Sequence, residues 1–377
     1  MPVSSSTPVV TPGTIVCPHL DVPHQPGMNL VWSAALELAW KRLMKQAGGP
    51  IELAGVAPDD PAARLVRILN ESPIEEGMLP REATVAWAGR ADERGAGELR
   101  REIERVFGPA EARRVDVPDV SRITVVGGLD LHPQFTVPFA RRTRTLAYRD
   151  KYAQAFGMWF DKDEPSDVWQ RRSAQVVVHF PRYADDELAQ LSDEERDAAY
   201  DDLVVEFRPA DAAISLLVAN VSWVSTLRDT VAGVLSHLQD VDGAPNARFT
   251  KKEGICLPVI RIACEAIFDQ LSHRPIANCA LRGRYLGELQ QRVIFQFDEG
   301  GASAPSMMRN PYGGALMSPR RWYHDAPFNL LVVVERNARS PIFACWFGNS
   351  NAFVEGPEPE ESARLRRYRR SDGRSVR

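Results

Sequence analysis

The sequence predicts an α+β fold, with a helical segment near the N-terminus and a remainder rich in strands. Two observations predict it. Apolar residues recur every three to four positions between Leu30 and Lys45, which is the spacing of one helix face. From residue 122 onward, short β-branched runs of strand length replace that spacing. The 377 residues are enough for one large domain or two average ones.

The first third contains an arm and two expected helices. Residues 1–28 hold six prolines, too many for a helix, and indicate an extended arm. The helix over 30–45 follows, and a second is expected over 97–107 because Leu99, Ile103 and Phe107 lie four apart. Residues 46–96 give no clear assignment.

The remainder alternates strands with two short helices. A helix is expected over 226–238, with Thr226 as its cap, and another over 263–271. The expected strands share β-branched or aromatic residues over four to eight positions: 123–126, 175–180, 203–207, 213–219, 255–262, 293–298, 328–335 and 341–347.

Three segments show no strand or helix period. The acidic run 184–202 indicates a solvated face, because no metal-ligand spacing stands out. Residues 355–377, rich in arginine, predict a disordered tail. Residues 299–327 lie between two strands, and so long a connection inside a domain is typically functional or disordered.

Composition excludes several classes of protein. The net charge of −4 argues against a nucleic-acid binder, and no apolar run is long enough to cross a membrane. We find no secretory signal at the N-terminus. The five cysteines are odd in number and widely spaced, which predicts free thiols in a reducing compartment, hence a cytoplasmic protein.

Motifs of catalysis and cofactor binding are missing from the sequence. Neither a nucleophile elbow nor a glycine-rich phosphate loop occurs. None of the seven histidines belongs to a His-Glu-x-x-His pattern, and no Cys-x-x-Cys pair occurs. We therefore expect no enzyme activity, no cofactor and no metal site.

The most informative feature is the start of the long connection. The expected strand 293–298 is followed by Glu299-Gly300-Gly301-Ala302-Ser303-Ala304, which is acidic and then uniformly small. Small residues in succession permit close backbone approach, and they allow a segment to change from loop to strand without steric conflict.

This segment carries a resemblance to a known family. Asp298 to Ala304 resembles the hinge of serpins, and Pro327-Phe328 with the apolar run to Glu335 is similar to their signature. The spacing of 28 positions between Glu299 and Pro327 is close to that of the serpin reactive loop. The segment 340–349 resembles the family's closing strand.

Weaker similarities extend the resemblance upstream, over residues 123–350 with one anchor near residue 29. They lie at Asn29 to Ser33, Phe135 to Phe139, Tyr200 to Phe207, Ile214 to Val218 and Leu257 to Ile262. The chain thus resembles a divergent, bacterial serpin-like protein. The resemblance implies one domain over 29–354, with helices around a large, mainly antiparallel sheet and a smaller barrel-like sheet.

The resemblance also implies a function. A serpin-like loop presents a bait peptide to a serine or cysteine protease, which is acylated while the cut loop inserts into the main sheet. Counting from both ends places the scissile bond near Ala315 or Leu316, with Met317 next. These small or apolar residues suit chymotrypsin-, elastase- or subtilisin-like pockets. A monomer without nucleic-acid or membrane partners is expected.

Several residues depart from the family pattern. Pro305 and Pro311 would each remove a donor from an inserted strand. Gln291 stands where the family has a histidine, Leu36 replaces a serine and Gly127 an asparagine. Two functions therefore stay open: a trapping inhibitor, and a non-inhibitory binding protein whose loop does not insert.

Overall fold

The computed structural model describes most of the chain between residues 10 and 358. The described ranges are 10–90, 92–115, 122–141, 145–148, 151–158, 165–180, 192, 203–238, 254–300, 321–323 and 328–358. None of the helices described there is long and apolar enough to cross a membrane.

Six α-helices are described, and their ends follow local capping rules. They are α1 (Ala35–Ala47), α2 (Pro61–Asn70), α3 (Glu93–Phe107), α4 (Pro109–Ala112), α5 (Ser166–Ser173) and α8 (Leu227–Ser236). Asp60, Asp92 and Thr226 cap α2, α3 and α8 by accepting backbone N–H bonds. Helix α1 ends at Gly48, whose φ of 78° is readily reached by a residue without Cβ.

The largest sheet has seven strands in the order β1-β2-β17-β16-β11-β10-β9. All neighbours are antiparallel except β1 and β2. The strands are β1 (Thr14–Cys17), β2 (Asn29–Ser33), β9 (Val176–Phe180), β10 (Leu203–Phe207), β11 (Ile214–Asn220), β16 (Leu330–Glu335) and β17 (Ser340–Trp346).

Two four-stranded sheets and one hairpin complete the β structure. One sheet has the order β13-β14-β4-β3, the other β15-β12-β8-β5, and β6 pairs with β7. Their bounds are β3 (Thr84–Arg90), β4 (Arg122–Leu131), β5 (Ala140–Arg141), β6 (Leu146–Tyr148), β7 (Lys151–Ala153), β8 (Ala155–Met158), β12 (Gly254–Pro258), β13 (Ile260–Ile267), β14 (Tyr285–Phe297) and β15 (Arg321–Tyr323).

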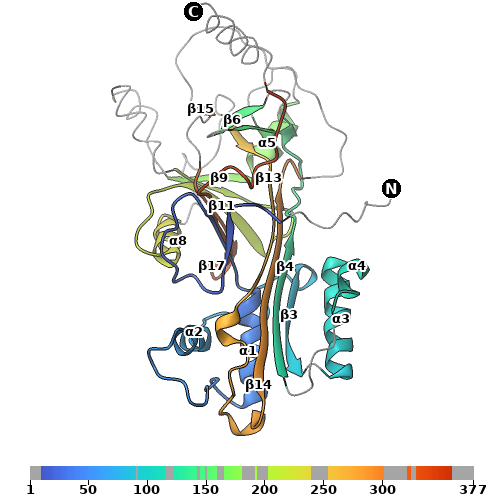
Figure 1. The fold of residues 1–377 in the computed structure, drawn as a ribbon. Helices are drawn as coiled ribbons and strands as arrows, with labels where there is room; N and C mark the ends of the chain where they lie inside the picture. Colours follow the sequence, from blue (N-terminus) through green and yellow to red (C-terminus); the bar gives the residue numbers. More distant parts are fainter. Residues whose placement is uncertain are drawn as a thin grey trace, which may run out of the picture.

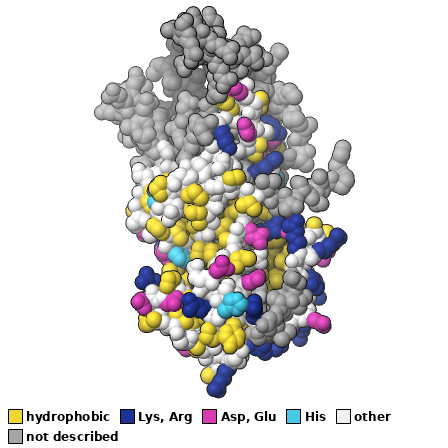
Figure 2. Space-filling model, viewed as in Figure 1, with side chains coloured by type: hydrophobic (Ala, Val, Ile, Leu, Met, Phe, Trp, Pro, Cys, Tyr) yellow, Lys and Arg dark blue, Asp and Glu magenta, His cyan; other side chains and the backbone are white. Residues whose placement is uncertain are grey.

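The β13-β14-β4-β3 sheet runs along the length of the molecule with a helix on each face (Figure 1). Two adjacent glycines of β4 mark the two faces: Gly127 meets the backbone of α1 at Leu36, and Gly128 meets the ring of Phe107 at the end of α3. The outer side of α3 is charged and exposed, as Figure 2 shows along the edge that α3 occupies in Figure 1. The sheet is thus an inner layer at β4, which is covered on both faces, whereas β13 keeps exposed residues such as Arg261 and Glu265.

The α+β prediction is confirmed, with one large, mainly antiparallel sheet and smaller sheets beside it. None of the described sheets closes into a barrel. Strand 203–207 and the hairpin around residues 336–339 lie where the sequence placed them, and Thr226 does cap α8. The helix expected over 97–107 is confirmed as part of α3.

Two predicted helices are wrong in part or entirely. Residues 30–33, placed at the start of the helix expected over 30–45, belong to the fully buried strand β2, and α1 begins only at Ala35. Residues 263–271, expected as a helix, continue strand β13 to Ile267 and end in a short 3₁₀ turn, Asp269–Leu271. Pairing along β14 holds this segment extended.

Candidate functional site: the β4–β14 seam and the base of the loop

The centre of the inner sheet is a parallel pair inside an otherwise antiparallel sheet. We call it the seam: β4 residues Arg122–Leu131 against β14 residues Tyr285–Phe295, with a bulge between Leu286 and Leu289. Both flanking pairs, β13 with β14 and β3 with β4, are antiparallel. Parallel pairing is slightly less stable per residue than antiparallel pairing.

The loop leaves the sheet at the end of β14, where Asp298 is held by three donors. His132 Nε2 lies 3.1 Å from its carboxylate, the Gly300 backbone N–H donates at 2.9 Å, and the Gln296 amide donates as well. Partial burial alone would raise the pKa of Asp298, but these hydrogen bonds lower it well below its usual range. Asp298 is therefore an ionised anchor.

Glu299 and Gly300 attach the same corner to the segment after β4. The Glu299 carbonyl accepts from the Phe139 N–H at 3.0 Å, and its carboxylate lies 3.4 Å from Arg141 Nη1. Gly300 has a φ of +58°, and a Cβ there would stand 2.6 Å from the Phe135 ring. A glycine is required here for both its dihedral angle and its lack of a side chain. The first two of the predicted hinge residues thus lie in a tightly packed corner.

In the middle of the seam, two of the five residues that depart from the serpin pattern are register partners: Gln291 pairs with Gly127. Gln291 is fully buried and donates from Nε2 to the Ser33 carbonyl at 2.8 Å, just before α1 begins. Its Oε1 has no hydrogen-bond partner among the described residues. A Cβ on Gly127 would lie 2.5 Å from Leu36 N and Cα, so α1 lies directly on the seam.

The other predicted structural residues have clear packing roles. Asn29 is buried and exchanges two hydrogen bonds with Asn349, of 2.9 and 3.0 Å. Ser33 is buried and accepts from the Ala35 N–H, which fixes the passage from β2 into α1. Phe328 packs edge-on against Phe347 at 5.3 Å between ring centroids.

The remaining predicted site residues lie outside the described residues. These are the small hinge residues, the three candidates for the scissile bond, the two prolines and the first signature residue: Gly301, Ala302, Ser303, Ala304, Ala315, Leu316, Met317, Pro305, Pro311 and Pro327. Sequence reasoning missed His132, which no motif marks and which only the fold brings to Asp298, 166 positions away.

The five cysteines are all free thiols, and most of them lie in the core. Four cysteines are buried and unbridged, and Cys279 is exposed. Burial raises the pKa of Cys17 and of Cys264 to about 12, so both are protonated and unreactive at neutral pH. Among the described residues, no group of three or more His, Cys, Asp or Glu side chains is placed to hold a metal ion.

Comparison with known proteins gives similarity at the level of solved structures. No protein-family model and no curated protein sequence matches the chain. The chain is similar to maspin, with 13% identity and a TM-score of 0.48, and to a serine protease inhibitor of Manduca sexta (serpin-12), with 14% and 0.47. It is similar to native protease nexin-1 with heparin at 12% and 0.45. Each similarity covers 85% of this chain and 92% of the other.

Proposed function

We propose that this chain is a serpin-like protease inhibitor. Its segment 299–327 is a bait loop, cut near Ala315 or Leu316, and the part before the cut enters the seam between β4 and β14. The observation that carries the proposal is the direction of the strands in the inner sheet.

A chain that turns back at the end of β14 runs antiparallel to β14. Because β4 is parallel to β14, that chain also runs antiparallel to β4. A strand inserted between them would replace one parallel ladder by two antiparallel ladders, and the whole sheet would become antiparallel. Asp298 to Gly300 lie where such a turn must form.

The length of the loop supports the same geometry. Strand β14 has 13 residues, which extend over about 44 Å at 3.4 Å per residue. Residues 301–315 are 15 in number (315 − 301 + 1) and reach about 51 Å when extended. A cut after Ala315 therefore frees enough chain to line the whole of β14.

The two prolines weaken insertion on one edge only. In a strand, the N–H and C=O groups of alternate residues point to opposite neighbours. Pro305 and Pro311 are six positions apart, so both missing donors face the same neighbouring strand. Each leaves one acceptor unpaired, at about 1–3 kcal/mol if it is buried. The other ladder remains complete.

The chemistry of trapping would come from the protease. Its serine or cysteine attacks the carbonyl at the scissile bond and forms an acyl-enzyme. Insertion carries the acylated protease away from the start of the loop before water can attack the ester. The uncut fold must then be metastable, with insertion releasing stored free energy. No cofactor takes part, and the partner is a protease with a pocket for small or apolar residues.

The test is to cut the loop with a protease and to measure how the cut changes thermal stability. The chain is treated with an elastase-like protease, the cut is located by mass spectrometry, and thermal unfolding is compared before and after. Inhibition predicts a cut near Ala315, a large rise in Tm and a covalent complex that survives denaturing electrophoresis. Cleavage with an unchanged Tm and no complex would rule the proposal out.

Proline variants sharpen this test. Pro305→Ala with Pro311→Ala should raise the Tm of the cut protein further and leave the uncut protein unchanged. Pro319→Ala is the matched control, because it lies after the expected cut and does not enter the sheet. Equal effects of all three changes would contradict insertion.

The alternative is a binding protein of the same fold whose loop does not insert. The close contact of α1 with Gly127 favours it, because opening the seam must disturb a helix packed directly on β4. This alternative predicts a nicked chain with unchanged Tm.

A further inference from the structure

The face of the inner sheet that carries α3 also carries an ion pair that spans the seam. Arg292 on β14 is the register partner of Gly128 on β4, directly across the seam. Its Nη1 bonds to the carboxylate of Glu111 on α4, and the two side chains are only 15% and 10% exposed. Its guanidinium carbon lies 5.2 Å from the centre of the Phe107 ring, at the end of α3. Arg292 thus contacts the helical layer that covers β4.

This helical layer belongs to the β4 side of the seam. Helix α3 packs on β3 and β4 through four buried residues: Val85, Trp87, Leu99 and Val126. Helix α4 follows α3 after a single residue, Gly108. The Phe107 ring lies where a side chain of Gly128 would be, 2.6 Å from the position of its Cβ. Arg292 therefore reaches from the β14 side to helices that are attached to the β4 side.

The two ion pairs of Arg292 differ in what they connect. Glu265, its register partner on β13, lies 3.8 Å from the guanidinium, is 41% exposed and stays on the β14 side of the seam. Glu111 is less exposed and lies on the other side. Arg114, in the same segment as Glu111, holds that carboxylate at 3.2 Å. The Arg292–Glu111 bond is thus a side-chain link across the seam, in addition to the parallel ladder of the backbone.

Entry of a strand into the seam would break this link. Neighbouring strands lie about 4.8 Å apart, so a strand between β4 and β14 would move Arg292 away from Glu111 by that distance. A hydrogen-bonded ion pair does not span such a gap, and α4 cannot follow β14 while α3 stays packed on β3 and β4. Because both side chains are largely buried, separating them leaves two charges without full solvation, which is unfavourable.

We propose that Arg292 and Glu111 form a latch, which holds the seam closed in the uncut chain and slows the entry of a strand. The second statement rests on the proposed function, because it takes the seam as the place where the loop enters. The first statement does not, because folded sheets open locally and transiently without any ligand. Loss of the latch should therefore make the seam open more often, with or without a cut loop.

The first experiment measures amide hydrogen exchange by mass spectrometry on the uncut, full-length chain. Glu111→Gln should raise the exchange rate of the seam amides, over residues 127–131 and 291–297, by about tenfold, as for loss of one charge-assisted hydrogen bond. The amides of β16 and β17, in the seven-stranded sheet, should keep the parent's rate. Arg292→Gln tests the same latch from β14, and the double variant should exchange no faster than Arg292→Gln alone.

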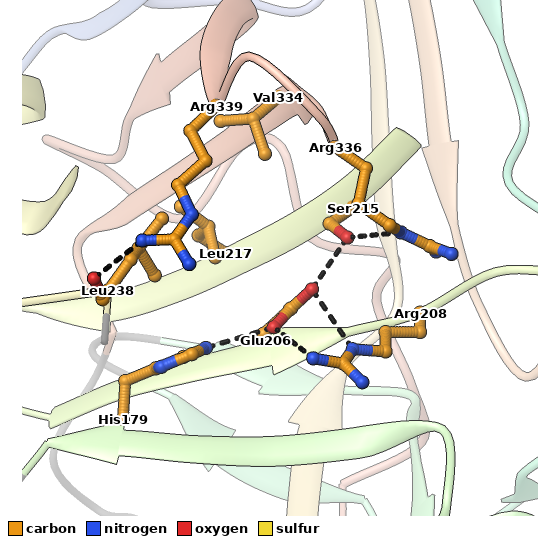
Figure 3. Close-up of a pocket in the computed structure, with 9 residues that line it drawn as sticks. All are labelled: His179, Glu206, Arg208, Ser215, Leu217, Leu238, Val334, Arg336 and Arg339. Carbon is orange, nitrogen blue, oxygen red and sulfur yellow. Dashed lines mark hydrogen bonds and ion pairs between the residues drawn. The ribbon is translucent and has the colours of Figure 1, made fainter. Parts of the chain in front are cut away.

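A second buried carboxylate, Glu206 on β10, provides the matched control, because it is 9% exposed and lies in the seven-stranded sheet. Figure 3 shows it beside a cavity of about 80 Å³, where it accepts from Ser215 Oγ at 2.6 Å and from Arg208 through two bonds of 3.2 Å. His179 Nε2 lies 2.9 Å away. Burial alone would raise the pKa of Glu206, but the hydrogen bonds from His179, Arg208 and Ser215 lower it to about 2. Glu206→Gln should therefore lower overall stability without selectively accelerating exchange at the seam.

The second experiment follows entry itself. A synthetic peptide of residues 301–315, labelled with a fluorophore at its N-terminus, is mixed with the uncut chain, and its uptake is followed by fluorescence anisotropy. Uptake by Glu111→Gln should be about tenfold faster than by the parent, in line with the change in seam opening. Uptake by Glu206→Gln should match that of the parent.

Failure of the latch and failure of the proposed function are distinguishable. If exchange at the seam is equal in Glu111→Gln and the parent, or if Glu206→Gln accelerates it as much, the latch is overturned. Faster exchange with unchanged uptake would overturn its control of entry. If the parent takes up no peptide and its Tm does not rise after a cut, the proposed function fails, and hydrogen exchange of the uncut chain still decides whether the latch holds the seam closed.

Discussion

Replacing Gly127 by alanine tests how tightly α1 lies on the seam. The new Cβ would stand 2.5 Å from Leu36 N and Cα and 2.8 Å from Ala35 C. Ordinary contacts of a Cβ begin near 3.4 Å, so α1 must withdraw by roughly 0.9 Å. Overpacking typically costs about 1–3 kcal/mol. Because backbone atoms block the site, we expect a cost at or above the upper end of that range.

Two other glycines give matched controls. Gly128→Ala meets the Phe107 ring at 2.6 Å, and because a side chain can move, this change should cost less than Gly127→Ala. Gly97→Ala lies in α3 with nothing within 4 Å of the new Cβ, so its helix propensity should stabilise the protein by about 0.5–1 kcal/mol.

The assay is equilibrium unfolding in urea by circular dichroism and tryptophan fluorescence, with coincident transitions as the condition for comparing free energies. From the most to the least stable protein, we expect the order Gly97→Ala, parent, Gly128→Ala and Gly127→Ala. If Gly127→Ala is as stable as the parent, α1 does not rest on the seam, and the packing that we describe there is wrong.

Two further predictions concern Glu206 and Gly300. Because the folded-state pKa of Glu206 is depressed from 4.5 to about 2, its stabilisation is present above pH 4.5 and is lost as the pH falls toward 2. The free energy of unfolding of the parent should therefore fall by about 3 kcal/mol more than that of Glu206→Gln over this range, measured by urea titration at each pH. Gly300→Ala should cost about 1–3 kcal/mol through its positive φ and its contact with Phe135. Gly283 has a φ of +76° and no atom within 4 Å of a new Cβ, so Gly283→Ala should show only the cost of the strained backbone angle. If the two variants lose the same free energy of unfolding, the contact with Phe135 contributes nothing to the cost of Gly300→Ala.

The sequence predicted elements well where period and burial agree, and failed in one segment that is buried on all sides and in another whose strand pairing overrides its local preference. Strand β2 is entirely buried and its centre, residues 30–32, is apolar, and such a run has no period that distinguishes strand from helix. Residues 263–267 contain alanine and glutamate, which favour helices, but pairing with β14 overrides that preference. Neither outcome could be derived without knowing the neighbouring strand.

The candidate site was predicted in its sequence-local part only. The acidic and small residues after β14 are visible in the sequence, and Glu299 and Gly300 do lie at the end of that strand. The parallel direction of β4, the contact of His132 with Asp298 and the cavity around Glu206 depend on residues that are far apart in the chain. No spacing along the chain encodes such contacts.

The positions of the two loop ends explain why a cut would be needed for full insertion. Strand β14 belongs to the inner sheet, whereas β15 pairs with β12 in another sheet, beyond the end of β14 in Figure 1. To run along all 13 residues of β14 and return to β15, an uncut loop needs about 26 extended residues. Only 20 (320 − 301 + 1) separate Gly300 from Arg321. On the proposed function, an intact loop of this length would be able to enter the seam only in part, and cleavage would free the upstream segment to fill it.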